Sequence, residues 1–331
     1  MQAIKILQIG IGPLGIKIAK MIQKRKGVET VAAVDIHPNL SGKDLGLLYG
    51  EAPSGVIITD DLTKAVLSTQ PDIVVLTTVS DMQRIAPQLE AILQLGLPVV
   101  STCEELSYPW EEAPEAATKI DTLARAAGVA VLGTGVNPGF LMDAFPVFLT
   151  AVCQHVAHVR VNRYQDAQFR RIPFQKKIGA GLTLDQFEEK KQEGTLRHVG
   201  LTESMQMIAR RMAWQLTKTE DIIAPIIAQK TIKTDAMTIA AGKATGVEQI
   251  GRGYIGDEVK IELHFRAAVG EPESFDEIMI SGTPDLHSRI QGGVNGDIAT
   301  GAMVINAIPR VLEATSGLKT MMDICPVSFF F

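Results

Sequence analysis

Short apolar runs alternate with amphipathic stretches through the first part of the chain. The apolar runs predict β-strands at Ile4–Ile9, Thr30–Asp35, Ile73–Thr77, Pro98–Ser101 and Val129–Leu132. The amphipathic stretches predict helices at Gly15–Lys26, Asp61–Ser68, Met82–Leu95 and Ala113–Ala127. Because strands separated by helices pair in parallel through right-handed crossovers, the pattern predicts an α/β fold with a doubly wound parallel sheet. The strands are almost wholly apolar, as expected for a sheet covered on both faces.

The pattern changes after Pro138. Val156–Arg163 and Glu258–Ala267 alternate apolar and polar residues like strands with one wet face, and Thr202–Leu216 reads as a long helix. Met279–Ser281 is apolar and ends at a Gly-Thr-Pro turn. These features predict an α+β substrate and dimerisation domain with an open, mixed, mostly antiparallel sheet.

Three segments follow from this division. We expect a dinucleotide-binding domain over residues 1–137 and a substrate domain over residues 138–299. In residues 300–331, the helical stretch Thr300–Glu313 is expected to pack back on the first domain. The terminal Phe329–Phe331 is either tucked in or a disordered tail. Few helices are predicted in the middle segment to cover its strands. One face of that sheet would then be buried against a second copy of the chain, which favours a homodimer with two-fold symmetry.

Composition narrows the class of protein. The 331 residues are 46% hydrophobic and 21% charged, with a net charge of −5, so no basic surface for nucleic acid is expected. No apolar run approaches the roughly 20 residues of a membrane span, and no secretory signal pattern opens the chain. The three cysteines form no C-x-x-C pair, and no His-Glu-x-x-His motif occurs. We therefore expect a cytoplasmic protein without a metal or a membrane partner.

The first turn reads Gly10-Ile11-Gly12-Pro13-Leu14-Gly15, between a predicted strand and a predicted helix. In that context a G-x-G-x-x-G sequence predicts a dinucleotide site. Gly10 allows the tight turn, Gly12 lets the backbone approach the pyrophosphate, and Gly15 lets the helix pack against the strand. Pro13 is tolerated because the first N–H groups of a helix have no internal partner. The helix N-terminus then favours the negative pyrophosphate.

Asp35 ends the second predicted strand, where an acid accepts hydrogen bonds from the adenosine ribose. Its charge would repel a 2′-phosphate, and no Arg follows it directly. His37 works the other way, because a protonated imidazole would attract that phosphate. We therefore predict NAD as the cofactor, with NADP as the alternative.

Ligands of doubly wound sheets bind beyond the carboxyl ends of the strands. Glu104 and Glu105 follow one such end and predict either an acid–base group or a solvated cap of the next helix. Cys103 is either a reactive thiol or a small buried residue. The turn at Asn137 to Gly139 is either a pocket wall or an interdomain turn.

Other polar residues also leave two interpretations open. His198 and His264 are either pocket residues or packed histidines of the fold. The basic stretch from Arg170 to Lys177 would bind an anion or form a solvated face.

The chain resembles the 2,4-diaminopentanoate dehydrogenases and the related native amine dehydrogenases over nearly its whole length. The resemblance rests on Gly10 to Gly15, Ser101 to Pro109, Gly133 to Asp143, Glu193 to Thr195, His198 to Gly200 and Asn306 to Pro309. It implies NAD(P)H-dependent reductive amination of an aldehyde or ketone with ammonia, and the reverse oxidative deamination. The family's essential carboxylate matches Glu104, which would deprotonate ammonium and stabilise the cationic iminium.

Between Gln165 and Gly181 the chain looks like the amine dehydrogenase branch, which favours simple aldehydes and ketones over an amino acid. Dihydrodipicolinate reductase activity is not expected, because no two histidines are adjacent. A nucleotide-sensing protein without turnover is the alternative of another class. Besides the fingerprint, Asp35 and His37, we assign to the cofactor Thr77, Thr78, Cys103, Asn137 and Asn306. We assign to the substrate Asn137, Phe140, Asn162, Phe169, Phe174, His198 and His264.

Overall fold

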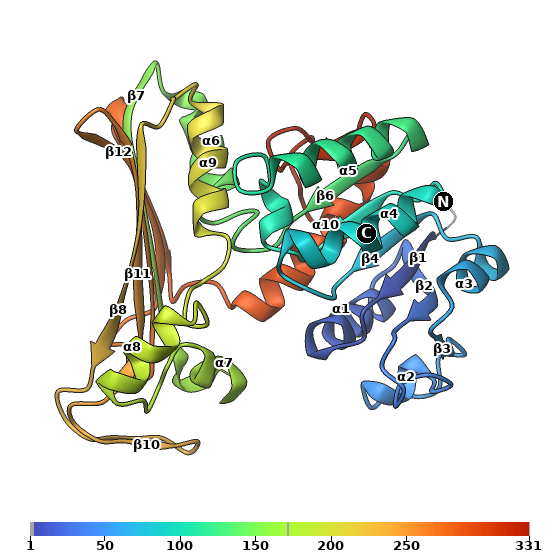
Figure 1. The fold of residues 1–331 in the computed structure, drawn as a ribbon, viewed down its shortest axis with the longest axis horizontal. Helices are drawn as coiled ribbons and strands as arrows, with labels where there is room; N and C mark the ends of the chain where they lie inside the picture. The colour runs from blue at the N-terminus through green and yellow to red at the C-terminus, as the bar shows by residue number, and fades with distance from the viewer. Residues whose placement is uncertain (1–2, 171, 331) are drawn as a thin grey trace. The chain divides into compact units, whose positions relative to one another are not determined.

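The computed structural model describes residues 3–170 and 172–330 (Figure 1). The chain forms two compact units. The first comprises Met1–Phe140 and Asn295–Phe331, and the second comprises Leu141–Val294. Arg171, from the predicted basic stretch, and Phe331, from the terminal tail, lie outside the described residues.

The first unit is built on a seven-stranded sheet with the order β15-β6-β5-β4-β1-β2-β3. Every pairing in it is parallel. The strands are β1 (Ile4–Ile9), β2 (Val28–Val34), β3 (Ile58–Thr59), β4 (Ile73–Leu76), β5 (Val99–Ser101), β6 (Ala130–Gly133) and β15 (Gly317–Lys319). From β1, the chain adds strands first on one side, as β2 and β3, and then on the other side, as β4, β5 and β6. This change of side beside β1 is typical of a doubly wound sheet, so that prediction is confirmed.

Helices connect these parallel strands, and several start at residues that favour helix N-termini. They are α1 (Pro13–Gln23), α2 (Leu45–Leu48), α3 (Leu62–Thr69), α4 (Met82–Gln94), η1 (Glu105–Ser107), α5 (Pro114–Ala127) and α10 (Gly296–Glu313). The side chains of Asp61 and Asp81 cap α3 and α4. Leu89 of α4 and Ile120 of α5 pack in one core with Leu76 of the sheet. Helices α1 and α10 contact each other.

The second unit is built on a six-stranded sheet with the order β14-β13-β7-β12-β11-β8. The pair β7 and β12 is parallel and the other pairs are antiparallel, so the predicted mixed sheet is confirmed. The strands are β7 (His155–Asp166), β8 (Lys218–Ile227), β11 (Ala244–Ile255), β12 (Glu258–Ala268), β13 (Phe275–Thr283) and β14 (Leu286–Gln291). A small hairpin is formed by β9 (Ile232–Lys233) and β10 (Thr238–Ile239).

The helices of the second unit lie on one face of this sheet (Figure 1). They are α6 (Ala144–Leu149), η2 (Thr150–Val152), η3 (Ala167–Phe169), α7 (Ile172–Lys177), α8 (Leu184–Gln192) and α9 (Leu201–Arg211). Phe187 of α8 packs with Val247 and Phe265 of the sheet in one core. Because alternate residues of a strand point to opposite faces, Glu248 and His264 lie on the other face. We call that second surface the open face.

Several elements differ from the sequence prediction, which did not include strands β3, β8, β11 and β14 or helix α8. The helix expected over Thr202–Leu216 ends at Arg211, because Ala213 adopts a left-handed φ of 54° and the Trp214 N–H turns back to the carbonyl of Ala209. Strand β15 was not predicted either, and it pairs with β6 at the edge of the sheet. Among the described residues, no helix has the length and apolar character needed to cross a bilayer.

Candidate active site

The glycine-rich turn is packed tightly on one side and open on the other. A Cβ atom on Gly15 would lie 2.0 Å from the carbonyl oxygen of Gly10, and a Cβ on Gly10 would lie 2.7 Å from that of Thr77. Gly10 also has a left-handed φ of 88°. A Cβ on Gly12 would meet nothing within 4 Å. The turn therefore leaves open space beside Gly12, where a ligand can approach the backbone.

Helix α1 begins at this open position without a side-chain cap. Gly12 is its N-cap, and Pro13 is the first helical residue. The first turn of α1 contains no acidic residue that would compete with an anion. Uncapped N–H groups and the helix dipole attract a phosphate. The residues present therefore fit the pyrophosphate of a nicotinamide dinucleotide.

Asp35 lies beside this turn. Its Oδ2 accepts a hydrogen bond from the backbone N–H of Ile11 at 2.6 Å, and its Oδ1 accepts one from that of His37 at 2.8 Å. The Nδ1 of His37 accepts a hydrogen bond from the backbone N–H of Asn39 at 3.2 Å. Each carboxylate oxygen can accept a further hydrogen bond, so Asp35 can still bind a ribose hydroxyl.

The two adjacent glutamates, Glu104 and Glu105, lie in the loop after β5. Oε2 of Glu105 accepts a hydrogen bond from the backbone N–H of Met82 at 2.8 Å, at the start of α4. Glu105 therefore helps to cap α4, which precedes the pair in the chain, and not the following helix that the cap interpretation expected. Glu104 is half-buried just before η1, and its carbonyl accepts a 2.7 Å hydrogen bond from the hydroxyl of Ser107.

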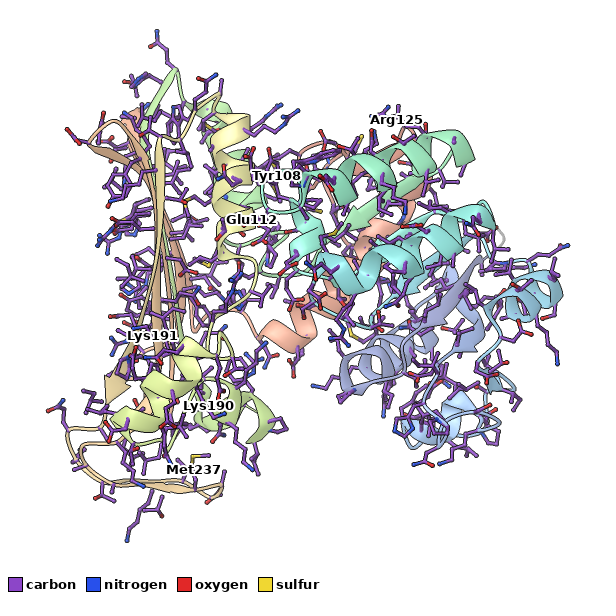
Figure 2. The ribbon with its side chains drawn as sticks, in the orientation of Figure 1. Tyr108, Glu112, Arg125, Lys190, Lys191 and Met237 are labelled. Carbon is purple, nitrogen blue, oxygen red and sulfur yellow. The ribbon has the colours of Figure 1, made fainter. Side chains whose placement is uncertain are left out.

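The segment around Glu104 is tightly packed. A Cβ on Gly133, at the end of β6, would lie 2.5 Å from the backbone of Leu106. Tyr108 is buried, whereas Glu112 further along the chain is exposed. Figure 2 labels both residues. Cys103 is also buried, and burial raises the pKa of its thiol far above the usual range. A raised pKa makes the thiol unreactive, which favours the interpretation of Cys103 as a small core residue.

Asn137 lies in the loop after β6 and is buried. Its bond to Pro138 is cis, and Gly139 follows with a φ of 123°. The N–H of Val136 donates to the hydroxyl of Thr300 on α10 at 3.3 Å. The loops after β1, β4, β5 and β6 all follow the carboxyl ends of parallel neighbours, so Asn137 and Glu104 lie on the same edge as the fingerprint. Phe140 ends the first of the two segments that make up the first unit.

The structure does not support a cofactor contact for Asn306. Its Oδ1 accepts a 2.7 Å hydrogen bond from the guanidinium of Arg25, which follows the C-terminal end of α1. The fingerprint lies at the other end of that helix. The same guanidinium donates to the carbonyl of Phe330 and stacks on Phe329. Arg25, which Asn306 holds in place, therefore contacts Phe329 and Phe330, although Phe329 remains 62% exposed.

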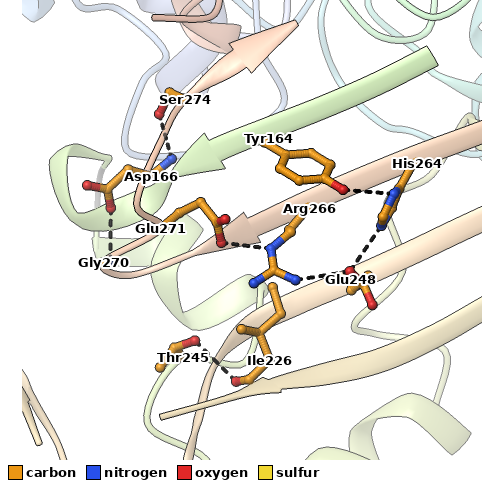
Figure 3. Close-up of polar contacts among 10 residues, drawn as sticks. All are labelled: Tyr164, Asp166, Ile226, Thr245, Glu248, His264, Arg266, Gly270, Glu271 and Ser274. Atoms are coloured by element: carbon orange, nitrogen blue, oxygen red, sulfur yellow. Dashed lines mark hydrogen bonds and ion pairs between the residues drawn. The ribbon is translucent and has the colours of Figure 1, made fainter. Parts of the chain in front are cut away.

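The predicted substrate residues occupy both faces of the second sheet. His264 contacts the hydroxyl of Tyr164 at 3.0 Å and the carboxylate of Glu248 at 3.0 Å on the open face (Figure 3). Asn162 is the neighbour of His264 in the parallel register and donates to Glu277 at 2.8 Å. His198 instead stacks on Phe265, which belongs to the helix-covered core.

These positions do not bring the predicted substrate residues of the second unit together. Asn162 and His264 face away from His198, so one chain cannot bring all of them to one ligand. Phe174 packs against the helix-covered core and lies under the guanidinium of Arg170. Phe169 is 83% exposed. Residues on the helix-covered face are thus the stronger candidates for a common pocket.

Comparisons with known proteins agree with this geometry. Residues 4–108 match the N-terminal domain of dihydrodipicolinate reductase, and residues 140–329 match the 2,4-diaminopentanoate dehydrogenase C-terminal domain. The 2,4-diaminopentanoate dehydrogenase of Acetoanaerobium sticklandii is 33% identical, over 98% of this chain and 94% of its own.

Two solved structures share the fold. The amine dehydrogenase of Mycobacterium smegmatis superposes with a TM-score of 0.84 at 24% identity, over 99% of this chain and 97% of its own. A dihydrodipicolinate reductase of a Paenisporosarcina species has a TM-score of 0.53 at 14% identity, over 96% of this chain and 98% of its own.

The fold and the site together define an NAD(P)-dependent dehydrogenase with a Rossmann domain. The chain belongs to the 2,4-diaminopentanoate dehydrogenase family. It is therefore an oxidoreductase that acts on CH–NH₂ groups, which replaces the alternative of a sensor without turnover.

Proposed function

We propose that this protein catalyses the reductive amination of small aldehydes and ketones with ammonia, and the reverse oxidative deamination, with Glu104 as the catalytic carboxylate. The observation that carries the assignment is the position of Glu104 after the carboxyl end of β5, in the parallel sheet that also carries the dinucleotide fingerprint. Glu105 is committed to the backbone of Met82 at the start of α4. Glu104 lies on the edge of the sheet where the dinucleotide fingerprint also lies.

The chemistry needs one negative charge at two stages. Ammonium must lose a proton before its nitrogen can attack the carbonyl carbon, and a carboxylate can accept that proton. Addition gives a carbinolamine, and the protonated carboxyl returns its proton to the hydroxyl of that intermediate, which leaves as water. The product is a cationic iminium, and the regenerated carboxylate stabilises its positive charge. The nicotinamide, when bound, supplies the hydride that reduces the iminium carbon.

The remaining residues would act by binding and orientation. The turn at Gly12 and the start of α1 would hold the pyrophosphate, and Asp35 would hold the adenosine ribose. The buried amide of Asn137 would orient the carboxamide of the nicotinamide or the substrate. NAD is proposed over NADP because of the charge of Asp35.

A second candidate substrate class is a diamino acid. The identity of 33% over nearly the whole chain to a 2,4-diaminopentanoate dehydrogenase favours it. The stretch between Gln165 and Gly181, which is similar to amine dehydrogenases, favours simple carbonyl compounds instead.

A substrate panel separates the two candidates. NADH or NADPH oxidation would be followed with ammonia and a series of small aldehydes and ketones, and NAD reduction with 2,4-diaminopentanoate and simple amines. We expect turnover with simple carbonyl compounds and amines. Turnover of the diamino acid alone would instead support the second candidate, and turnover of neither would contradict both.

A further inference from the structure

Gln8 is an unexpected residue in the central strand of the parallel sheet. Strand β1 is otherwise largely apolar, and Gln8 is 0% exposed between β2 and β4. Within the described part of the chain, its Oε1 has no hydrogen-bond partner. Burying a polar atom without a hydrogen-bond partner destabilises the folded protein. A buried amide of this kind therefore calls for an explanation in terms of structure or function.

The other end of the amide reaches the glycine-rich turn. Nε2 of Gln8 donates to the hydroxyl of Thr77 at 2.9 Å and lies 3.4 Å from the carbonyl oxygen of Gly10. The hydroxyl of Thr77 in turn donates to the carbonyl of Gly10 at 2.7 Å. The hydroxyl that the sequence assigns to the cofactor therefore points into the protein, at the turn.

The peptide between Gly10 and Ile11 is consequently held at both of its polar groups. Thr77 binds its carbonyl, and Asp35 binds its N–H. A Cβ on Gly15 would lie 2.7 Å from the Thr77 hydroxyl, so this hydroxyl also fills the space beneath the first turn of α1. The orientation of this one peptide fixes the direction in which the chain enters Gly12.

We propose that the buried Gln8 and the half-buried Thr77 form a relay that positions the Gly10–Ile11 peptide for dinucleotide binding. Thr77 is then a positioning residue and makes no direct contact with the cofactor. A turn that is already ordered loses less conformational freedom when the ligand binds, so the relay raises affinity for the dinucleotide. The proposal depends on neither the carbonyl substrate nor Glu104.

The test measures the Kd of NADH by fluorescence titration of the full-length protein. Thr77→Val keeps the shape of the side chain and removes its donor. We expect the Kd to rise about 3- to 10-fold, the effect of one uncharged hydrogen bond. Thr77→Ser restores the hydroxyl and should bind within about 2-fold of the wild type. The kcat at saturating NADH should change less than about 2-fold in both variants.

Thr69→Val is the matched control. The hydroxyl of Thr69 also donates to a backbone carbonyl at 2.8 Å, but on α3. The variant Thr69→Val should lower the melting temperature of the protein without changing the Kd of NADH. Gln8→Met keeps the length of the side chain but removes its amide. This variant replaces Thr77→Val in the test if Thr77→Val does not fold. It should raise the Kd in the same direction.

Gln8→Glu gives a separate pH signature. A carboxylate cannot donate to Thr77, whereas a protonated carboxyl can, and burial favours the protonated form. Its NADH affinity should therefore fall with rising pH relative to the wild type. The proposal is wrong if Thr77→Val binds NADH as tightly as the wild type, or if Thr77→Ser binds as weakly as Thr77→Val.

Discussion

The carboxylate of Asp35 and the backbone N–H of Ile11 are joined by a 2.6 Å hydrogen bond that ties the end of β2 to the glycine-rich turn. The residue that would bind the ribose therefore also shapes the loop that would bind the pyrophosphate. A substitution at Asp35 changes the local charge and loosens the turn at the same time.

We predict that Asp35→Ser shifts the cofactor preference toward NADP by about 1 to 2 kcal/mol, the value of a charged hydrogen bond lost or a repulsion relieved. Because the bond to Ile11 is lost, the variant should also bind NADH more weakly. The measurement is kcat/KM with each cofactor. A clear NADP preference of the wild-type protein would contradict this account of Asp35.

The open face of the second sheet leads to a prediction about assembly. Its side chains carry both signs of charge in close pairs, such as Arg266 with Glu248 at 3.0 Å (Figure 3). Arg252 and Glu262 form another pair at 3.0 Å. A surface that mixes both charges can be complementary to itself across a two-fold axis. We therefore expect a homodimer that buries this face.

Light scattering at micromolar concentration should give about twice the chain mass of 35.7 kDa. Ile222→Asp introduces a charge on the open face and should shift the protein toward monomer. Leu184→Asp on α8 is the matched control, because both side chains are 43% exposed. A monomeric wild-type protein would refute the prediction.

His158 links the stability of the second unit to pH. Burial lowers its pKa below the ordinary value, and nearby Arg160 and Lys260 act in the same direction, whereas Glu262 opposes them. The unfolded chain, with a histidine pKa of about 6.5, then binds more protons than the folded one in mildly acidic solution. Stability should accordingly fall as the pH drops below about 7.

Urea unfolding between about pH 8 and pH 5 would measure this effect on the free energy of unfolding. The range brackets the histidine pKa of about 6.5 in the unfolded chain. His158→Gln should lose less stability over this range than the wild type. His155→Gln, an exposed position on the same strand, serves as the control. Equal pH dependence of wild type and His158→Gln would exclude the contribution of this imidazole.

The first unit could be predicted closely because its signals are local. Each buried parallel strand is a short apolar run between helices, and the fingerprint Gly10 to Gly15 has a fixed geometry. Strand β15 escaped prediction because three residues after a helix carry no periodicity, and they join the sheet only through pairing with β6.

The substrate residues were harder to predict because proximity depends on which face of a strand a residue occupies. Asn162 is two residues from Arg160 on one strand, and His264 is two residues from Glu262 on the next. Because residues two apart on a strand point to the same face, the alternation alone could have placed both on the polar face. The inward hydroxyl of Thr77 could not be read from the sequence, because it depends on contacts between β1 and β4 that are distant along the chain.

The central claim concerns the two glutamates after β5. Removing the charge of Glu104 should stop the chemistry, whereas the Glu105 side chain accepts a helix N–H that a glutamine can also satisfy. Both variants should bind NADH nearly as the wild type does, because the fingerprint and Asp35 are unchanged.

The most direct test compares Glu104→Gln with Glu105→Gln in steady-state reductive amination, with the Kd of NADH measured for both. Glu104→Gln should lower the rate at least about 100-fold, the lower range for a positioned acid–base group. Glu105→Gln should lower it less than about 10-fold, or 1.4 kcal/mol. Loss of activity in Glu105→Gln alone, or in neither variant, would contradict the assignment of Glu104 as the catalytic carboxylate.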